Sequence, residues 1–115
     1  MKTATRMASA SAMIVGLDGM SGGVCFSYFD ESGLRVIAAR TVPAALQRMP
    51  EAMPGVVVMA DDLEPTEIAQ IEDHALAIGA VLAIIPRSAN EMEIRSRLTE
   101  AIRAPRPRVA EEEAG

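Results

Sequence analysis

Four short apolar runs recur along the chain, and each is bounded by turn-forming or charged residues. The runs are MIVGL (13–17), LRVIAA (34–39), GVVVMA (55–60) and AVLAII (80–85). Their apolar residues are largely continuous rather than alternating, which is typical of strands covered on both faces. The pattern therefore predicts a mostly parallel central sheet with helices on each side.

Helical periodicity follows the third run. Residues 64–79 have Pro65 near the first turn and stop at Gly79, the residue types expected at a helix start and end. The apolar positions at helical spacing are Ile68, Ile71, Ala75 and Ile78. They form one stripe, so we expect an amphipathic helix that packs on the sheet. A shorter helix fits residues 42–49.

A second clear helix follows the fourth run, over residues 88–103. Ser88 stands three positions before Glu91, which is the spacing of a capping box. The apolar stripe consists of Ile94, Leu98, Ala101 and Ile102, and the favourable i,i+4 charge pairs are Glu91–Arg95 and Glu93–Arg97. This segment is expected to close the domain.

The stretch GGVCFSYFDESG (22–33) fits two structures. As a helix it places Val24, Cys25, Tyr28 and Phe29 on one face. As a strand it has suitable β-branched and aromatic residues followed by a DESG turn. Glycine disfavours a helix interior by about 1 kcal/mol, although less in the first turn, where these two glycines stand. Both alternatives remain open at this stage.

Length and composition set limits on the class of protein. A chain of 115 residues with 50% apolar residues forms one domain, which we place at residues 12–103. Residues 1–11 are expected to be a disordered leader and residues 104–115 a disordered tail. No apolar run approaches the roughly 20 residues that span a bilayer. We expect no membrane partner.

Charge and cysteine content narrow the class further. The net charge is −5, so there is no general attraction to nucleic acid or anionic lipid. Cys25 is the sole cysteine, which excludes an internal disulfide and a cysteine-rich metal site. A reducing, cytoplasmic location is the expectation.

With residues 22–32 helical, the chain resembles a response-regulator receiver domain. Three stretches carry the likeness: MIVGLDGMSGGVCFSYFDESGLRVIAARTVPAAL, MPGVVVMADD and HALAIGAVLAIIPRSANEMEIRSRLTEAI. Together they cover about residues 13–103. The resemblance implies an α/β, three-layer, receiver-like (flavodoxin-like) sandwich with a mostly parallel central sheet.

The receiver chemistry, however, is missing from the matching positions. The acidic pair expected after the first strand falls on Gly16 and Leu17, with Asp18 just beyond. The phosphoacceptor position falls on Ala60, and the lysine before the late proline is Ile85. No serine or threonine switch residue is evident, and one βα unit is absent. The resemblance is therefore to a degenerate receiver, or pseudo-receiver.

Two carboxylates could still meet at adjacent strand ends. Asp18 follows the first strand and Asp61 follows the third. Carboxylate oxygens are ligands for Mg²⁺, so a weak divalent-metal site at this pair is retained as a hypothesis. Against it, an Asp-Gly pair is a common turn, and acidic residues before a helix favour its N-terminal dipole.

If residues 22–32 form a strand instead, the order of elements resembles that of ribonuclease H-like nucleases, including Holliday-junction resolvases. GLDGMSGGV then matches the first hairpin, with Asp18 as first metal ligand, Asp61 or Asp62 as second, and Glu91 or Glu93 as third. Two-metal hydrolysis needs such a carboxylate cluster. The acidic net charge and the lack of a basic stripe argue against a nucleic-acid partner.

Other chemical signals are weak. The turn GMSGG lacks the lysine and the hydroxyl residue of a phosphate-binding loop. His74 has no second histidine or nearby cysteine and is read as a surface residue. Cys25 is read as a small core residue.

The sequence thus predicts a non-catalytic receiver-like module with no cofactor, which works by binding another protein such as a signalling kinase or effector. In receivers the late strand and its flanking helices usually form the partner surface. The matching face spans residues 85–94 and includes Arg87, Asn90 and Glu91 as expected exposed residues. Self-association into a homodimer is a second expectation.

Overall fold

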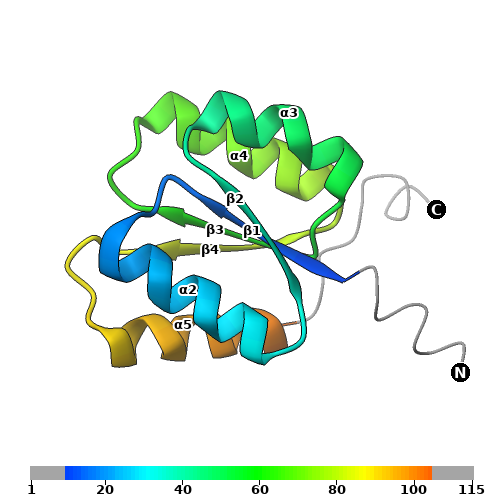
Figure 1. Cartoon of the computed structure of the whole chain (residues 1–115). Coiled ribbons are helices and arrows are strands. Elements are labelled where there is room, and N and C mark those ends of the chain that lie inside the picture. The colour runs from blue at the N-terminus through cyan, green and yellow to red at the C-terminus, as the bar shows by residue number, and fades with distance from the viewer. Residues whose placement is uncertain (1–9, 105–115) are drawn as a thin grey trace, which may run out of the picture.

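A computed structural model describes residues 10–104. Strands and helices alternate along the chain (Figure 1). The strands are β1 (Ser11–Val15), β2 (Arg35–Ala39), β3 (Val56–Ala60) and β4 (Val81–Ile85), and the helices are α2 (Gly19–Glu31), α3 (Val42–Ala52), α4 (Pro65–Ala77) and α5 (Glu91–Arg103).

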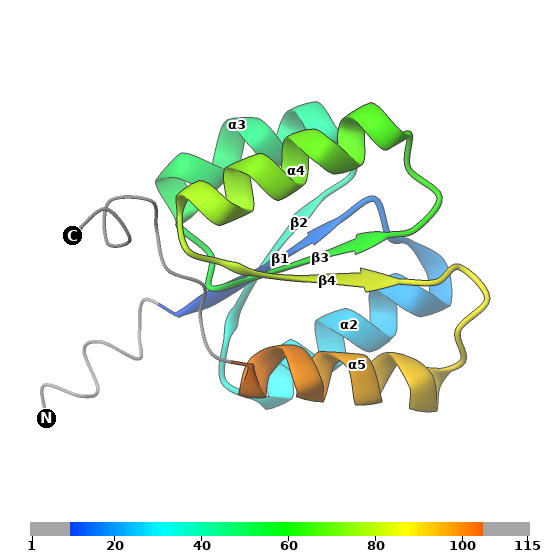
Figure 2. The same ribbon diagram turned by 180° about the vertical axis from the view of Figure 1, so that it is seen from behind.

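The four strands form one parallel sheet in the order β2-β1-β3-β4. Helices α2 and α5 lie on one face of the sheet, and α3 and α4 lie on the other (Figures 1 and 2). The molecule is a three-layer α/β sandwich, which confirms the fold class expected from the apolar runs.

The structure decides between the two alternatives for residues 22–33, because this stretch lies mostly within α2 and its strand interpretation is wrong. Gly22 shows why a glycine is needed there. A β-carbon built at Gly22 would come within 2.8 Å of the Leu17 carbonyl oxygen. The glycine lets the first turn of α2 approach the loop that follows β1.

Two boundaries differ from those expected. The first strand is Ser11–Val15 rather than 13–17, because Gly16 adopts a left-handed conformation (φ 68°) that ends the strand. Ser11 is 2% exposed and belongs to the sheet, so the domain begins before residue 12 and the expected leader is too long. Residues 1–9 and 105–115, which contain the rest of the predicted leader and tail, lie outside the described part of the chain.

The start of α5 also differs from the predicted one. Asn90, not Ser88, is the N-cap, and it forms a capping box with Glu93. The Ala89 N–H donates to the Pro86 carbonyl (3.0 Å), so a turn occupies the residues after β4 and delays the helix. The capping box therefore uses Glu93, the residue whose i,i+4 spacing predicted an ion pair with Arg97.

The core is aliphatic and lies in two layers. One cluster fills the space between the sheet and α3/α4, with Ile71 and Ala75 of α4 buried in it. The other lies between the sheet and α2/α5, with Cys25, Phe29 and Leu98 buried in it. Both helical stripes predicted from periodicity contribute to the core, except that Ile102 is 39% exposed near the end of α5. Within residues 10–104 no helix is long and apolar enough to cross a bilayer.

Candidate functional site

The loops at the carboxyl end of the sheet are the usual ligand-binding region of an open α/β fold. From β1 the chain moves outward to β2, whereas β3 pairs with the other side of β1 and leads to β4. In open α/β sheets, ligands bind outside the carboxyl ends of the strands where the winding reverses. Here that position lies between the loops after β1 and β3, and it brings together Asp18, Asp61 and Asp62.

A leucine side chain lies at this position. Leu63, from the loop before α4, packs against Gly16, the residue that follows β1. A β-carbon built at Gly16 would come within 3.3 Å of the Leu63 Cδ2 atom. Leu63 is half-buried and belongs to the partly buried residues packed on the α3/α4 core cluster. An apolar contact therefore stands where a ligand would enter.

Arg87, which follows β4, lies among the carboxylates. Its Nε and Nη2 atoms donate to Asp62 Oδ2 at 2.9 and 2.7 Å, and its Nη1 atom is 3.8 Å from Asp18 Oδ1. The backbone N–H of Arg87 donates to Asp61 Oδ1 at 3.1 Å. We call these four residues the Arg87 cluster. It ties the loops after β3 and β4 together with a charged contact to the loop after β1.

The Arg87 cluster is exposed, which limits its energetic role. The side chains of Arg87 and Asp62 are 54% and 48% exposed, and that of Asp18 is 91% exposed. Exposed ion pairs typically contribute about 0–1 kcal/mol. Among residues 10–104 there is no group of three or more His, Cys, Asp or Glu side chains that could hold a metal ion. The hypothesis of a metal at Asp18 and Asp61 stays untested, with an arginine already beside these carboxylates.

Two of the positions that the sequence resemblance aligns with a receiver phosphorylation site, Ala60 and Ile85, are apolar and buried. Ala60 ends β3 and Ile85 ends β4, and the two are partners in the sheet register. Each is 0% exposed. Neither side chain can accept a phosphoryl group or neutralise one.

The three residues expected to bind a partner are exposed, and each already has an intramolecular contact. Arg87 pairs with Asp62, as described above. The Asn90 side chain accepts from the Glu93 N–H at 2.8 Å, and Glu91 pairs with Arg95 at 3.2 Å. Met92 lies beside them and is 79% exposed. This methionine is absent from the surface residues predicted from sequence, although its position between two acidic residues and outside the apolar stripe indicates exposure.

Cys25 lies in the core, as expected. It is 0% exposed, and burial raises the pKa of its thiol to about 11. A thiol that is protonated at neutral pH and inaccessible is a poor nucleophile. His74 is exposed, and its Nδ1 atom contacts the Gln70 carbonyl of its own helix at 2.9 Å.

Polar side-chain contacts between α2 and α5 were also not predicted from the sequence. The Tyr28 and Thr99 hydroxyls are 2.6 Å apart, and the Arg95 guanidinium lies 5.8 Å from the centre of the Tyr28 ring. Arg95 also pairs with Glu31 at 3.3 Å. These polar contacts join residues far apart in sequence, so periodicity within one helix could not reveal them.

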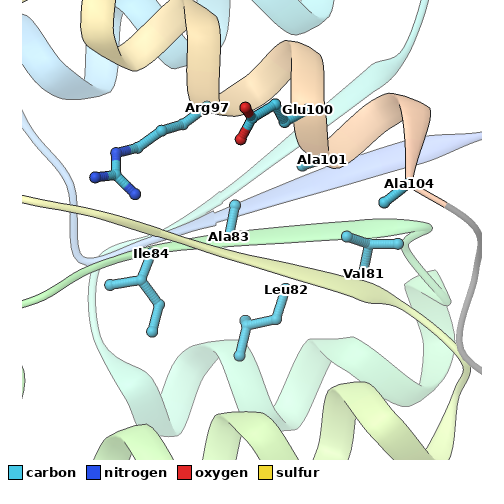
Figure 3. Close-up of a pocket in the computed structure, with 8 residues that line it drawn as sticks. All are labelled: Val81, Leu82, Ala83, Ile84, Arg97, Glu100, Ala101 and Ala104. Carbon is cyan, nitrogen blue, oxygen red and sulfur yellow. The ribbon is translucent and has the colours of Figure 1, made fainter.

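A shallow groove of about 270 Å³ runs between β4 and α5 (Figure 3). Val81 and Ala83 point toward α5, whereas Leu82 and Ile84 point to the other side of the sheet (Figure 3). The residues that line the groove are Val81, Leu82, Ala83, Ile84, Arg97, Glu100, Ala101 and Ala104. It is more apolar than the Arg87 cluster and lies along the outer side of β4.

Comparison with known proteins identifies the fold alone. No protein-family model matches the sequence, and no curated protein matches it. Among solved structures, the chain is similar to a de novo designed Rossmann 2x3 fold protein, with 12% sequence identity and a TM-score of 0.62. The match covers 81% of this chain and 89% of the designed one. The chain has a Rossmann-like α/β fold.

Proposed function

We propose that this domain is a non-catalytic, receiver-like module that binds another protein through the loops at the carboxyl end of its sheet. The observation that carries the proposal is the occupation of that end by the chain's own side chains. Leu63 packs against Gly16, and Arg87 is paired with Asp62. A small ligand would have to displace both contacts.

Aspartyl phosphorylation needs a carboxylate acceptor, a Mg²⁺ ion held by neighbouring carboxylates and a cation that neutralises the phosphoryl oxygens. Ala60 and Ile85 stand at two of the matching positions, and both are fully buried. Arg87 is a cation at this end of the sheet, but it is paired with Asp62. These features favour binding over group transfer.

The chemistry of the surface indicates the kind of partner. Arg87, Asn90 and Glu91 present both charge signs, and Met92 adds an exposed apolar side chain. Flexible methionine side chains adapt to partner surfaces, and mixed polar groups around an apolar contact are typical of transient protein interfaces. A signalling kinase or effector protein with a complementary mixed surface is the proposed partner class.

The first experiment tests the lack of phosphorylation. The full-length protein is incubated with acetyl phosphate and Mg²⁺ and its intact mass is measured, with Asp61→Asn as the matched variant. We expect no added phosphoryl group in either protein. A stoichiometric, acid-labile adduct that is lost in Asp61→Asn would overturn the non-catalytic proposal.

The second experiment tests the surface. Arg87→Ala and Met92→Ala are compared with Arg35→Ala, an exposed arginine on β2 at the other side of the sheet. Quantitative cross-linking in cell extract should show a product that weakens in the first two variants and persists in the third. Thermal melts should match in all three, because surface substitutions usually stay within about 0.5 kcal/mol. Equal cross-linking in all variants would remove this face from the proposal.

A further inference from the structure

The outer edge of β4 has no cover within residues 10–104. β4 is the last strand in the sheet order β2-β1-β3-β4. Helices cover both faces of the sheet, yet Val81 to Ile84 are all only partly buried. At the opposite edge of the sheet, β2 carries the exposed Arg35, and its Ala38 carbonyl accepts a hydrogen bond from Arg48. The β4 edge has neither feature, which leaves it open to pairing with another strand.

The backbone of β4 presents hydrogen-bonding groups outward. The Val81 N–H donates to the Gly55 carbonyl at 2.9 Å, and the Ile85 carbonyl accepts from the Asp61 N–H at 3.1 Å. Because backbone groups alternate in direction along a strand, Val81, Ala83 and Ile85 face β3. Leu82 and Ile84 therefore turn their N–H and C=O groups away from the sheet.

None of the usual protections against edge pairing is present in this strand. Natural edge strands carry lysine, proline, bulges or inward charges, or are covered by other segments. The sequence of β4 is VLAII, without a charge, a glycine or a proline. Pro86 comes only after the strand ends. An apolar edge strand whose outward donors and acceptors have no partner within residues 10–104 is a template for another strand.

We infer that the occupant is a second copy of this chain, with the two β4 strands antiparallel about a two-fold axis at Ala83. In this register Leu82 of one copy faces Ile84 of the other, and each such pair exchanges two backbone hydrogen bonds. Ala83 faces its own symmetry mate at the closest side-chain approach in an antiparallel pair, about 4.5 Å between Cα atoms. Its small side chain suits that position, and the two sheets become one continuous sheet.

Charges beside the strand fit the same two-fold arrangement. Arg97 and Glu100 of α5 line the groove, and Figure 3 shows both on the α5 side of β4, near Ala83. Both residues are exposed, and neither takes part in an ion pair found within residues 10–104. A two-fold axis at Ala83 brings Arg97 of one copy toward Glu100 of the other, which makes the surface self-complementary.

The groove between β4 and α5 adds buried surface area to the proposed dimer interface beyond that of the two paired strands. A specific interface buries about 1,200–2,000 Å² in total, more than two five-residue strands provide. Ala101 is only 8% exposed and forms the floor of the groove, whereas Ala104 is partly exposed on the flank of α5, where its small side chain lets a second copy approach closely. The surface borders the proposed partner face, because Arg97 and Glu100 also line a hollow with Asn90. The inference uses the β4 edge and its flanking charges and does not rest on the proposed function.

The test measures the mass of the full-length chain by sedimentation over a wide concentration range. We expect a monomer–dimer equilibrium. Leu82→Pro removes an outward N–H without removing a bond to β3, and Val36→Pro is the matched control on β2. The dimer dissociation constant should rise ~10-fold or more in Leu82→Pro and stay unchanged in Val36→Pro. A chain that stays monomeric at every concentration, or equal effects of both prolines, would overturn the inference.

A charge exchange tests the pairing if either proline variant fails to fold. Arg97→Glu should weaken the dimer because it sets like charges against each other, and adding Glu100→Arg should restore it. Hydrogen exchange gives an independent measurement, because the Leu82 and Ile84 amides should be protected only at concentrations where the dimer forms. Fast exchange of both amides in the dimer, or no rescue by the second charge, contradicts this arrangement.

Discussion

The two edges of the sheet are treated differently by the rest of the chain. On β2 the outward residues are Val36 and Ala38, because Arg35 and Ala39 bond to the chain of β1. The Ala38 carbonyl accepts a hydrogen bond from Arg48 Nη1 at 3.3 Å. Arg35, the first residue of β2, has an exposed charged side chain. On β4 the outward backbone groups belong to Leu82 and Ile84, and no charged side chain stands within the strand.

This difference shows that whether an edge strand can pair depends on a few side chains in the strand and beside it. Both edge strands have five residues and are rich in apolar side chains. One arginine on α3 and one at the start of β2 make the first edge unattractive to a second strand, since charges and occupied carbonyls oppose pairing. The β4 edge lacks both devices. Substitutions in the helices behind β4 and on the two edge strands can break or sharpen this contrast.

The largest effect is expected for Ile71→Asp. Ile71 is 0% exposed on α4, whose core cluster also receives Leu82 and Ile84 of β4. A carboxylate buried there without a partner should cost several kcal/mol, roughly 3 or more, and unfold much of the protein. Leu76→Asp is the matched control, because Leu76 is 55% exposed on the same helix.

Urea denaturation followed by circular dichroism checks this prediction. Leu76→Asp should leave the midpoint almost unchanged. If Ile71→Asp were equally mild, α4 would be only loosely attached to the sheet. The exposure of Leu82 and Ile84 would then vary with the position of α4, and it could not be used to distinguish the β4 edge from the β2 edge.

The next effect concerns pH and the helical layer on the other side of β4. Burial raises the pKa of Cys25 from 9.0 to about 11. The unfolded chain therefore loses the thiol proton first as pH rises. Stability from this group is fully present below pH 9.0 and is lost progressively up to about pH 11. Two pKa units correspond to a loss of at most about 2.7 kcal/mol.

Denaturation at pH 8, 9, 10 and 11 (values chosen to span roughly the interval between the two pKa values) measures the slope, and Cys25→Ala supplies the reference. The alanine variant lacks the titrating group, so its stability should fall less over this interval. Parallel curves for the two proteins would show that Cys25 is not held in a dry core. The α2/α5 layer behind Val81 and Ala83 would then be less tightly packed than the structure indicates.

Hydrophobic pattern predicted most of the fold because burial on both faces leaves a direct trace in sequence. The four apolar runs became the four strands, and the stripes through Ile71 and Leu98 became the inner faces of α4 and α5. The segment after β1 stayed ambiguous because its residue types suit both a helix and a strand. The reason for Gly22 is the close approach of the Leu17 carbonyl, and this depends on how the loop after β1 folds back on the first turn of α2.

The candidate site was less predictable for the same reason. The positions of Asp18 and Asp61 directly after two of the apolar runs predicted that both lie at one end of the sheet, because the carboxyl ends of parallel strands lie at the same end. The position of Arg87 among these carboxylates depends on the turn after β4, and the packing of Leu63 on Gly16 depends on the loop before α4. The run AVLAII also gave no sign of being an edge, since continuous apolar residues predict a strand buried on both sides.

A smaller effect is expected when β4 is given the kind of protection that β2 has. Ala83→Lys places a charge at the centre of the strand, on the side that faces the α5 groove. Folding should be nearly unaffected, because Ala83 is only partly buried and a long lysine side chain can reach solvent. In the antiparallel dimer the two lysines oppose each other, and the dissociation constant should rise by about tenfold, or 1.4 kcal/mol.

Sedimentation of Ala83→Lys beside Ala38→Lys makes this comparison direct. Ala38 lies on the β2 edge and is already exposed, so a lysine there should change neither folding nor association. If Ala38→Lys weakened the dimer as much as Ala83→Lys, both edges would contribute to association and the β4 edge would lose its special role.

The smallest effect is expected for Arg48→Ala, which removes cover from the β2 edge. The guanidinium contributes one long hydrogen bond, 3.3 Å from Nη1 to the Ala38 carbonyl, and both residues are exposed. Loss of such a contact should change the free energy of unfolding by no more than about 0.5 kcal/mol, because water replaces it. The β2 edge would still carry Arg35, so the monomer–dimer equilibrium should not change measurably. Larger assemblies in Arg48→Ala, seen as species heavier than the dimer in sedimentation, would mean that this single hydrogen bond had kept the second edge from pairing. The difference between the two edges would then be one of degree, set by one arginine.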